Sequence, residues 1–120
     1  MKVNILVIDD EDSIRFCFSR FLAAEGHNAI TANGYREALA RMDETEFNLI
    51  LADNVLGDGL GIDILREVMQ RNLNTRVIIM TAYPNKESIQ DSLSMHAADY
   101  LVKPLRQAGL LNSVNKALQQ

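Results

Sequence analysis

The sequence predicts an α/β fold in which a mainly parallel sheet carries helices on both faces. Short runs rich in leucine and β-branched residues alternate five times with stretches whose apolar residues recur at helical spacing. The connections are short, as in units where a helix crosses from one parallel strand to the next. The central runs are apolar without alternation, which is typical of strands that are covered on both faces.

The first strand is expected at Val3–Ile8 and the first helix over about Glu11–Glu25. The inward face of this helix is expected at Ile14, Phe18, Phe21 and Leu22, and widened by Phe16 and Cys17. Gly26 is expected to end the helix, and His27, in the turn that follows, is expected to be solvated.

A short edge strand is expected at Asn28–Ala32, before a helix over about Tyr35–Glu44. Asn33 stands where its side chain could cap that helix. The central strand is expected at Phe47–Ala52, and the polar, glycine-rich stretch Asn54–Gly61 follows it.

The second half continues the alternation of helices and strands. The expected elements are a helix at Gly61–Arg71, a strand at Arg76–Met80, a helix from Pro84-Asn85 to about Met95, a strand at Asp99–Val102 and a helix near Ala108–Leu118. The fourth helix offers only Ile89 and Leu93 as clear inward residues, so we expect its packing to be the weakest of the five.

Composition narrows the class of protein. A chain of 120 residues fits one domain. The net charge is -4 with no long run of either sign, whereas a nucleic-acid-binding face needs clustered Lys and Arg. No apolar run approaches the roughly 20 residues of a membrane helix, and the single cysteine cannot form an internal disulfide. We therefore expect a cytoplasmic protein.

Four of the five expected strands end at a charged or reactive side chain. These side chains are Asp9 and Asp10, Asp53, Thr81 and Lys103. Because parallel strands place their carboxyl ends at one edge of a sheet, where open α/β sheets bind ligands, we expect these groups to converge.

Such a cluster would require a cation. Two carboxylates about 5 Å apart repel by roughly 3 kcal/mol at an effective dielectric constant of 20. Mg²⁺ prefers a few carboxylates together with water and phosphate oxygens. A carboxylate beside a metal and Lys103 is a plausible nucleophile, and Thr81 could donate a hydrogen bond to a transferring phosphoryl group. The sequence therefore predicts that Asp53 accepts a phosphoryl group.

A family resemblance rests on this set. Asp9-Asp10, Asp53, Thr81-Ala82 and Lys103-Pro104, the last preceded by Asp99-Tyr100, resemble the receiver domain of bacterial two-component response regulators, in the chemotaxis-regulator-like superfamily. The resemblance covers essentially the whole chain, in order and at the family's spacings. It implies a flavodoxin-like, doubly wound sheet of five parallel strands in the order 2-1-3-4-5 with five helices, in a single receiver domain over residues 1–120.

The resemblance also implies roles in a metal site. Asp53 would take a phosphoryl group from a phosphohistidine of a sensor kinase and would also be a ligand of Mg²⁺. Asp10 would be a direct ligand, and Asp9 a ligand mostly through water. The backbone carbonyl of Val55 would complete the site.

Further roles follow from the same resemblance. Lys103 would pair with the acceptor carboxylate and then with the phosphoryl group, and the Lys103–Pro104 bond would be cis. Thr81 and Tyr100 would form the switch pair, with the hydroxyl moving toward the phosphoryl oxygens and the ring turning into the space it leaves. Such a switch needs contacts that differ between its two states.

The partners implied are a sensor histidine kinase or phosphotransfer protein, and an effector domain or output protein on the face of the fourth helix, fifth strand and fifth helix. The resemblance also allows a homodimer on phosphorylation, and it implies neither direct nucleic-acid binding nor a membrane partner. The chain stops soon after the fifth helix, so we expect either a stand-alone regulator or a part of a longer one without its effector domain.

Four positions depart from the family pattern, of which Gly109 lies early in the last helix and weakens it slightly. Asn54 stands where an apolar residue is usual, and Gly57 stands where proline is common, so we expect a more mobile loop after Asp53. His96 replaces a glycine; left-handed backbone there would cost on the order of 1 kcal/mol.

Two alternatives to a phosphorylated receiver stay open. One is a receiver-like interaction module that works without phosphorylation. The other is a Mg²⁺-dependent aspartyl phosphatase, although such enzymes usually carry an Asp-x-Asp pair and the pair here is adjacent. We expect a signalling domain that catalyses its own phosphoryl transfer and dephosphorylation rather than an enzyme acting on other substrates.

Overall fold

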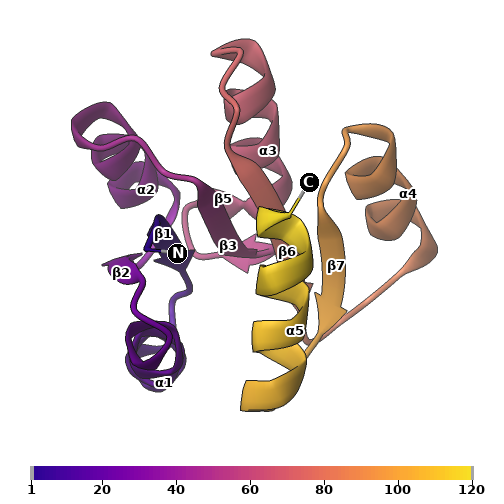
Figure 1. Cartoon of the computed structure of the whole chain (residues 1–120). Coiled ribbons are helices and arrows are strands. Elements are labelled where there is room, and N and C mark those ends of the chain that lie inside the picture. Colours follow the sequence, from indigo (N-terminus) through magenta and orange to yellow (C-terminus); the bar gives the residue numbers. More distant parts are fainter. Residues whose placement is uncertain (1, 120) are drawn as a thin grey trace.

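Five parallel strands form one sheet in the computed structural model, which describes residues 2–119. The strands are β1 (Asn4–Ile8), β2 (Asn28–Ala32), β3 (Leu49–Asp53), β6 (Arg76–Thr81) and β7 (Asp99–Val102). Their order in the sheet is β2-β1-β3-β6-β7 (Figure 1). Since β6 and β7 are the fourth and fifth long strands, this is the expected order 2-1-3-4-5, and the predicted fold class is confirmed.

Five helices cover the two faces of the sheet. They are α1 (Asp12–Ala24), α2 (Tyr35–Glu44), α3 (Gly61–Gln70), α4 (Lys86–Ser94) and α5 (Gln107–Leu118). In Figure 1, α1 and α5 lie on one face and α2, α3 and α4 on the other. No helix among the described residues has the length and hydrophobicity needed to cross a membrane.

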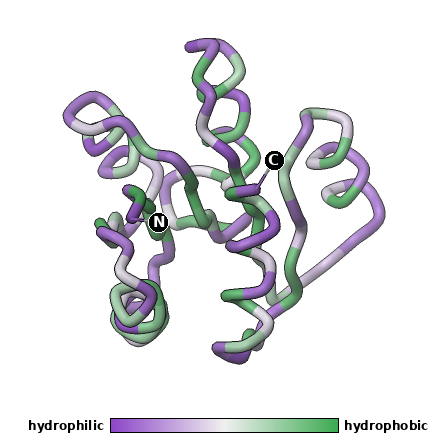
Figure 2. Tube along the Cα trace, viewed as in Figure 1, coloured by the Kyte–Doolittle hydropathy of each residue, from purple (hydrophilic) through white to green (hydrophobic). Residues whose placement is uncertain are grey.

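The core has two parts because side chains alternate between the faces of a strand. Leu6 and Ile8 of β1 pack with residues of α2 and α3, whereas Ile5 and Val7 pack with residues of α1 and α5. All four are fully buried. Figure 2 shows hydrophobic residues along these central strands, as expected for a sheet covered on both faces.

The strand register brings one set of strand ends level. Ile8 pairs with Ala52, and Asp53 pairs with Met80 in the next strand. Thr81 in turn pairs with Val102. We call this side of the sheet, where the strands end, the carboxyl edge, and the opposite side, where they begin, the amino edge.

Three strands have boundaries that differ from the prediction. The first strand, β1, begins at Asn4 rather than Val3. The central strand begins at Leu49 rather than Phe47, and it includes Asp53 as its last residue. The fourth long strand likewise includes Thr81. Continuous hydrophobicity does not reveal where pairing begins, whereas the observed pairing starts where Asn48 N donates to Asn4 O at 2.9 Å.

The stretch after Asp53 forms an antiparallel hairpin that the sequence did not predict. Its strands are β4 (Val55–Leu56) and β5 (Gly59–Leu60). The expected cap of α2 is also wrong, because the N-cap residue is Gly34 and not Asn33. The carboxylate of Asp58, at the tip of the hairpin, takes over the capping role.

Several side chains lie elsewhere than expected. Phe16 and Cys17 are exposed because they lie outside the helical stripe of Phe18 and Leu22. His27 is buried rather than solvated.

The prediction that Leu93 faces inward from α4 is wrong. Leu93 is 58% exposed, and Ser92 is the residue of this helix that is buried. Leu93 is one residue further along and therefore about 100° around the helix. His96, just after α4, has a φ of 64° and so adopts the left-handed backbone.

Candidate functional site

The carboxyl edge gathers the polar strand ends that the sequence singled out. Neighbouring ends are tied by backbone hydrogen bonds: Asn54 N donates to Met80 O at 2.7 Å, and Lys103 N donates to Thr81 O at 2.8 Å. The groups that follow the strands are therefore held in fixed relative positions, as parallel pairing requires.

Three carboxylates meet at this edge, and we call Asp9, Asp10 and Asp53 the acid cluster. One oxygen from each lies within 4.8 Å of the others. Asp9 is fully buried, Asp53 is 7% exposed and Asp10 is exposed. Oxygen donors this close together fit a hard divalent cation such as Mg²⁺, which binds a few carboxylates and keeps several waters.

Lys103, which directly follows β7, reaches the acid cluster. Its Nζ lies 2.6 Å from Asp9 Oδ2 and 3.2 Å from Asp53 Oδ2. Burial alone would lower the pKa of Lys103, but the hydrogen bond and the charge of Asp9, helped by Asp53, outweigh it, so that the pKa is raised. The lysine is therefore charged at neutral pH and is held mainly by Asp9.

Asp53 is the less well stabilised of the two partners of Lys103. Burial raises the pKa of Asp53; the charge of Lys103 opposes this shift, and the charge of Asp9 adds to it. A backbone hydrogen bond from Val55 N, 3.3 Å from Asp53 Oδ1, favours the ionised form but does not reverse the shift. Asp53 is thus a carboxylate for which added positive charge would be favourable.

Thr81 ends β6 at this edge, and Tyr100 lies on the adjacent strand β7. Thr81 is buried, and its Oγ1 accepts a hydrogen bond from Tyr83 N at 3.1 Å. The Tyr100 hydroxyl lies 2.6 Å from Ser88 Oγ of α4. The Tyr100 ring is half-buried against the core beneath α2 and α3. The aromatic ring is thus linked to α4 by a contact that the sequence did not indicate.

Val55 lies two residues after Asp53 and is an exposed residue of β4. The Lys103–Pro104 peptide bond is cis. The structure therefore places Asp9, Asp10, Asp53, Thr81 and Lys103 together at one edge.

Sequence reasoning missed Asp58. This residue stands between two glycines in what reads as a simple turn, and its partners lie 22 and 23 residues away. A carboxylate at the tip of a glycine-rich loop near a helix without its own cap is the signal that could have found it.

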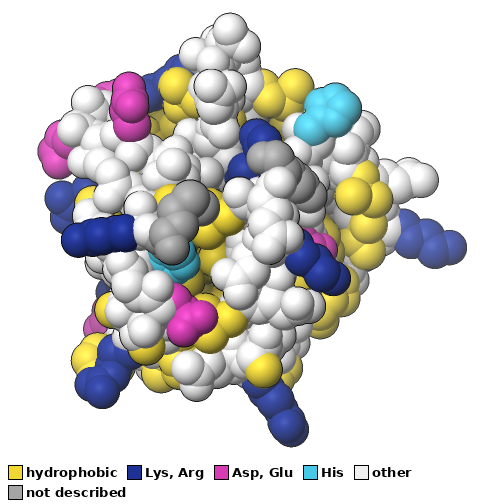
Figure 3. All heavy atoms as spheres, in the orientation of Figure 1, with side chains coloured by type: hydrophobic (Ala, Val, Ile, Leu, Met, Phe, Trp, Pro, Cys, Tyr) yellow, Lys and Arg dark blue, Asp and Glu magenta, His cyan; other side chains and the backbone are white. Residues whose placement is uncertain are grey.

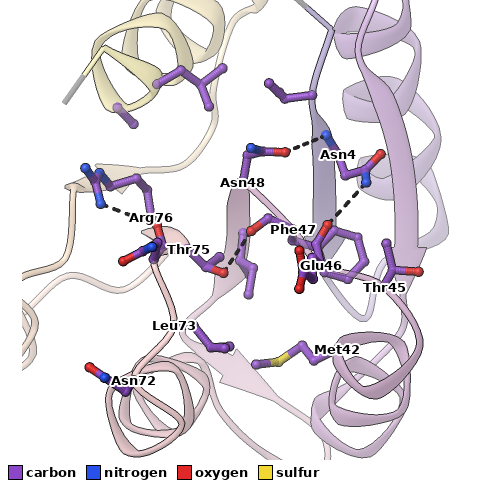
Figure 4. A pocket seen from close by; sticks show the side chains of 15 residues that line it. Asn4, Met42, Thr45, Glu46, Phe47, Asn48, Asn72, Leu73, Thr75 and Arg76 are labelled. Carbon is purple, nitrogen blue, oxygen red and sulfur yellow. Dashed lines mark hydrogen bonds between the residues drawn. The ribbon is translucent and has the colours of Figure 1, made fainter.

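A pocket lies at the opposite edge of the sheet (Figure 4). It encloses about 880 Å³ at the amino edge. Several of its polar groups are bonded to the protein itself: Asn48 Oδ1 accepts from Asn4 N at 3.0 Å, and Thr75 Oγ1 donates to Phe47 O at 2.8 Å. Among the described residues, the acid cluster is the group of His, Cys, Asp and Glu side chains that could hold a metal ion. We therefore place the candidate site at the carboxyl edge and not at this pocket.

The surface shown in Figure 3 does not point to a nucleic-acid interface. On this face of the described part of the chain, Lys and Arg side chains lie apart, separated by neutral and hydrophobic surface. They form no continuous basic stripe there, which a phosphate backbone would need.

Comparison with known sequences finds a matching family model and curated relatives. Residues 5–115 match the family model of the response regulator receiver domain. The transcriptional regulatory protein ZraR of Escherichia coli is 37% identical over 117 residues, which are 98% of this chain and 26% of ZraR. The chain thus spans about a quarter of the length of this relative.

Comparison with solved structures finds receiver domains that have a similar fold. A CheY-like receiver domain from Methanospirillum hungatei has a TM-score of 0.94 at 28% identity, with 99% of this chain and 95% of that chain covered. The beryllofluoride-activated NtrC4 receiver domain dimer has a TM-score of 0.90 at 28% identity, with 97% and 96% covered.

Proposed function

The chain belongs to the receiver domain family of two-component response regulators, and from this premise we propose that it is a switch controlled by phosphorylation of Asp53. The observation that carries the proposal is the convergence of three carboxylates and Lys103 at the carboxyl edge. Buried like charges beside a lysine are costly to a fold, which favours a functional reason for keeping them together.

The proposed reaction is a phosphoryl transfer to the side chain of Asp53. A carboxylate oxygen attacks the phosphorus of a phosphohistidine or a small acyl phosphate. A new oxygen–phosphorus bond forms as the bond between phosphorus and the donor nitrogen or oxygen breaks, and that electron pair leaves with the donor. Lys103, 3.2 Å from Asp53 Oδ2, is placed to neutralise the phosphoryl oxygens.

Asp10, Asp9, Asp53 and the backbone carbonyl of Val55 would hold Mg²⁺. The donor set is all oxygen, and its close carboxylates fit this ion. When bound, Mg²⁺ supplies neutralisation of the negative charge that builds up during phosphoryl transfer. The residues themselves orient the acceptor: Val55 N holds Asp53 Oδ1, and Lys103 holds Asp53 Oδ2.

The switch would operate through Thr81 and Tyr100. The Thr81 oxygen accepts a hydrogen bond from Tyr83, so its proton is able to bond a phosphoryl oxygen on Asp53. A shift of Thr81 would change the space beside Tyr100, whose hydroxyl bonds Ser88 of α4. Phosphorylation would thus reach α4 through contacts that differ between two states.

The partners follow from the same proposal. A sensor histidine kinase or phosphotransfer protein would donate the phosphoryl group, in the cytoplasm. The output partner, an effector domain or separate protein, would contact the face formed by α4, β7 and α5, where Leu93 and Val102 are exposed. The similar NtrC4 receiver was solved as a beryllofluoride-activated dimer, which supports a homodimer of this chain on phosphorylation as a further proposal.

Mass spectrometry after treatment with a small acyl phosphate and Mg²⁺ tests the proposal. The wild-type chain should gain one phosphoryl group on Asp53, and Asp53→Asn should gain none. Asp43→Asn is the matched control, because Asp43 is an exposed aspartate near the end of α2 that lies outside the acid cluster. A wild-type chain that stays unlabelled, or label retained in Asp53→Asn, would contradict the proposal and favour an interaction module that works without phosphorylation.

A further inference from the structure

The hairpin after Asp53 is tied at both of its ends. At its base, Gly61 N donates to Asn54 O at 2.9 Å, which closes the loop. At its tip, Asp58 reaches across to the start of α2. The two ties connect the segment next to the proposed phosphoacceptor with a helix that begins 18 residues before it in the sequence.

Asp58 caps α2 from outside that helix. Its Oδ1 accepts from Tyr35 N at 2.7 Å, and its Oδ2 accepts from Arg36 N at 3.0 Å. The N-cap residue Gly34 has no side chain that could do this. The hydrogen bonds from Arg36 and Tyr35 lower the pKa of Asp58, so the carboxylate is ionised where a helix N-terminus favours an anion.

The fit between the hairpin and α2 leaves no spare room. A Cβ on Gly34 would lie 2.6 Å from Asp58 Oδ1, and a Cβ on Gly59 would lie 2.9 Å from Tyr35 Cβ. Gly34 has a φ of -171°, an extended backbone that any residue can adopt, so close approach rather than conformation requires glycine there. Two glycines at one interface therefore support a specific contact independently of the hydrogen bonds.

The contact between Asp58 and α2 links the two backbone segments that flank the acid cluster. Ala32, two residues before Gly34, accepts a backbone hydrogen bond from Asp9 N at 3.2 Å. On the other side, Val55 begins the hairpin and donates to Asp53 Oδ1. Asp58 thus joins the segment beside Asp9 to the segment beside Asp53.

We propose that Asp58 is a positioning residue that fixes the backbone of Val55 relative to Asp9 and so holds the Mg²⁺ donor set together. The inference rests on the proposed function of the acid cluster and deepens it. Asp58 itself does not touch the metal or the phosphoryl group.

Titration of the amide spectrum with Mg²⁺, without any phosphoryl donor, tests this role. Asp58→Ala should weaken Mg²⁺ binding about tenfold, at the lower end of the losses that outer-shell substitutions cause. Asp43→Ala is the matched control: Asp43 Oδ1 bonds Arg71 at 2.8 Å and joins the other end of α2 to the end of α3. This control should leave the Mg²⁺ affinity at the wild-type value.

A double variant separates positioning from simple stabilisation of the helix. In Asp58→Ala/Gly34→Ser the serine can cap α2 from within, and the missing carboxylate leaves room for its side chain. The melting temperature should then return toward that of the wild type, while Mg²⁺ binding should stay weak. If Asp58→Ala does not fold, Asp58→Asn, which retains hydrogen-bond acceptors but loses the charge, should still bind Mg²⁺ more weakly than Asp43→Ala does.

The outcomes are distinct. Wild-type affinity in a folded Asp58→Ala, or in Asp58→Asn where the alanine variant does not fold, overturns the inference alone. Recovery of full affinity in the double variant also overturns it, because Asp58 would then act only through helix stability. A wild-type chain that binds no Mg²⁺ overturns the proposed function and this inference with it.

Discussion

The two edges of the sheet differ in the charge of their polar groups. At the amino edge, Asn4, Asn48 and Thr75 are neutral and bond to one another or to nearby backbone, although a pocket of about 880 Å³ is there. At the carboxyl edge, Asp9 and Asp53 are buried together as like charges that share one lysine. Stability alone favours the first arrangement, because neutral groups that satisfy each other cost less to bury than charges do.

This difference indicates that buried charge without full compensation identifies the functional edge better than pocket volume does. A large pocket whose polar groups are already bonded has few groups left to recognise a ligand. The acid cluster, by contrast, is stabilised by a bound cation or by any change that removes negative charge. Substitutions at the carboxyl edge should therefore change stability and Mg²⁺ binding, whereas a substitution at the amino edge should leave Mg²⁺ binding unchanged.

Removal of Lys103 should disturb the carboxyl edge most. Lys103→Ala leaves Asp9 fully buried without its cationic partner, so we expect a loss of about 3 kcal/mol in the free energy of unfolding at neutral pH. Because the pKa of Lys103 is raised, its contribution is present below the unfolded value of 10.5 and is lost as the pH rises through the folded pKa. Urea unfolding at neutral and alkaline pH measures both effects; a loss at neutral pH no greater than that of an exposed Lys→Ala variant, such as Lys86→Ala, would contradict the account.

Mg²⁺ should stabilise the wild-type chain through the acid cluster. At about 100 times the dissociation constant, an ion that binds only the folded state adds about 2.7 kcal/mol. Asp10→Asn should lose most of this gain at the same Mg²⁺ concentration, since Asp10 is an exposed member of the cluster. Thermal unfolding with Mg²⁺ and with a chelator gives the comparison, and an equal gain in both proteins would show that the ion binds elsewhere.

Neutralising Asp53 should stabilise the chain in the absence of Mg²⁺. We expect Asp53→Asn to raise the free energy of unfolding at neutral pH by about 1 kcal/mol, because the cost of burying the charge is removed together with the repulsion from Asp9, while the lysine keeps its main partner. Since the folded pKa of Asp53 is raised above 3.8, the wild type should recover this deficit as the pH falls through the folded pKa toward 3.8. A variant less stable than the wild type at neutral pH would show that Asp53 contributes to the fold.

The smallest effect is expected at the amino edge. Asn48→Ala removes the acceptor of the hydrogen bond from Asn4 N, so we expect a loss of about 1 kcal/mol in stability. Its Mg²⁺ affinity should equal that of the wild type. Weaker Mg²⁺ binding in this variant would break the proposed separation between the two edges.

The sequence predicted the fold and the convergence of the polar strand ends, for a specific physical reason. Parallel strands must end at one edge, so the order of the strands and the residue after each strand suffice to place Asp9, Asp53 and Lys103 together. The boundaries were less accurate because Phe47 is apolar but precedes the pairing.

The parts that could not be predicted depend on contacts between distant segments. The cap that Asp58 places on α2 joins residues 22 and 23 positions apart, and the hairpin pairs two strands of only two residues each, so neither leaves a periodic pattern. Likewise, the half-turn of α4 that faces the sheet presents Ser92 rather than Leu93, which hydrophobicity alone does not indicate.

The most direct test is the amide spectrum of the wild-type chain with Mg²⁺ and beryllofluoride, a phosphoryl mimic. The account predicts that the largest shifts occur at Asp53, Thr81 and Lys103, that Asn4 and Asn48 at the amino edge do not move, and that Asp53→Asn shows no response to the mimic. An unchanged wild-type spectrum, or shifts as large at the amino edge as at the carboxyl edge, would contradict it.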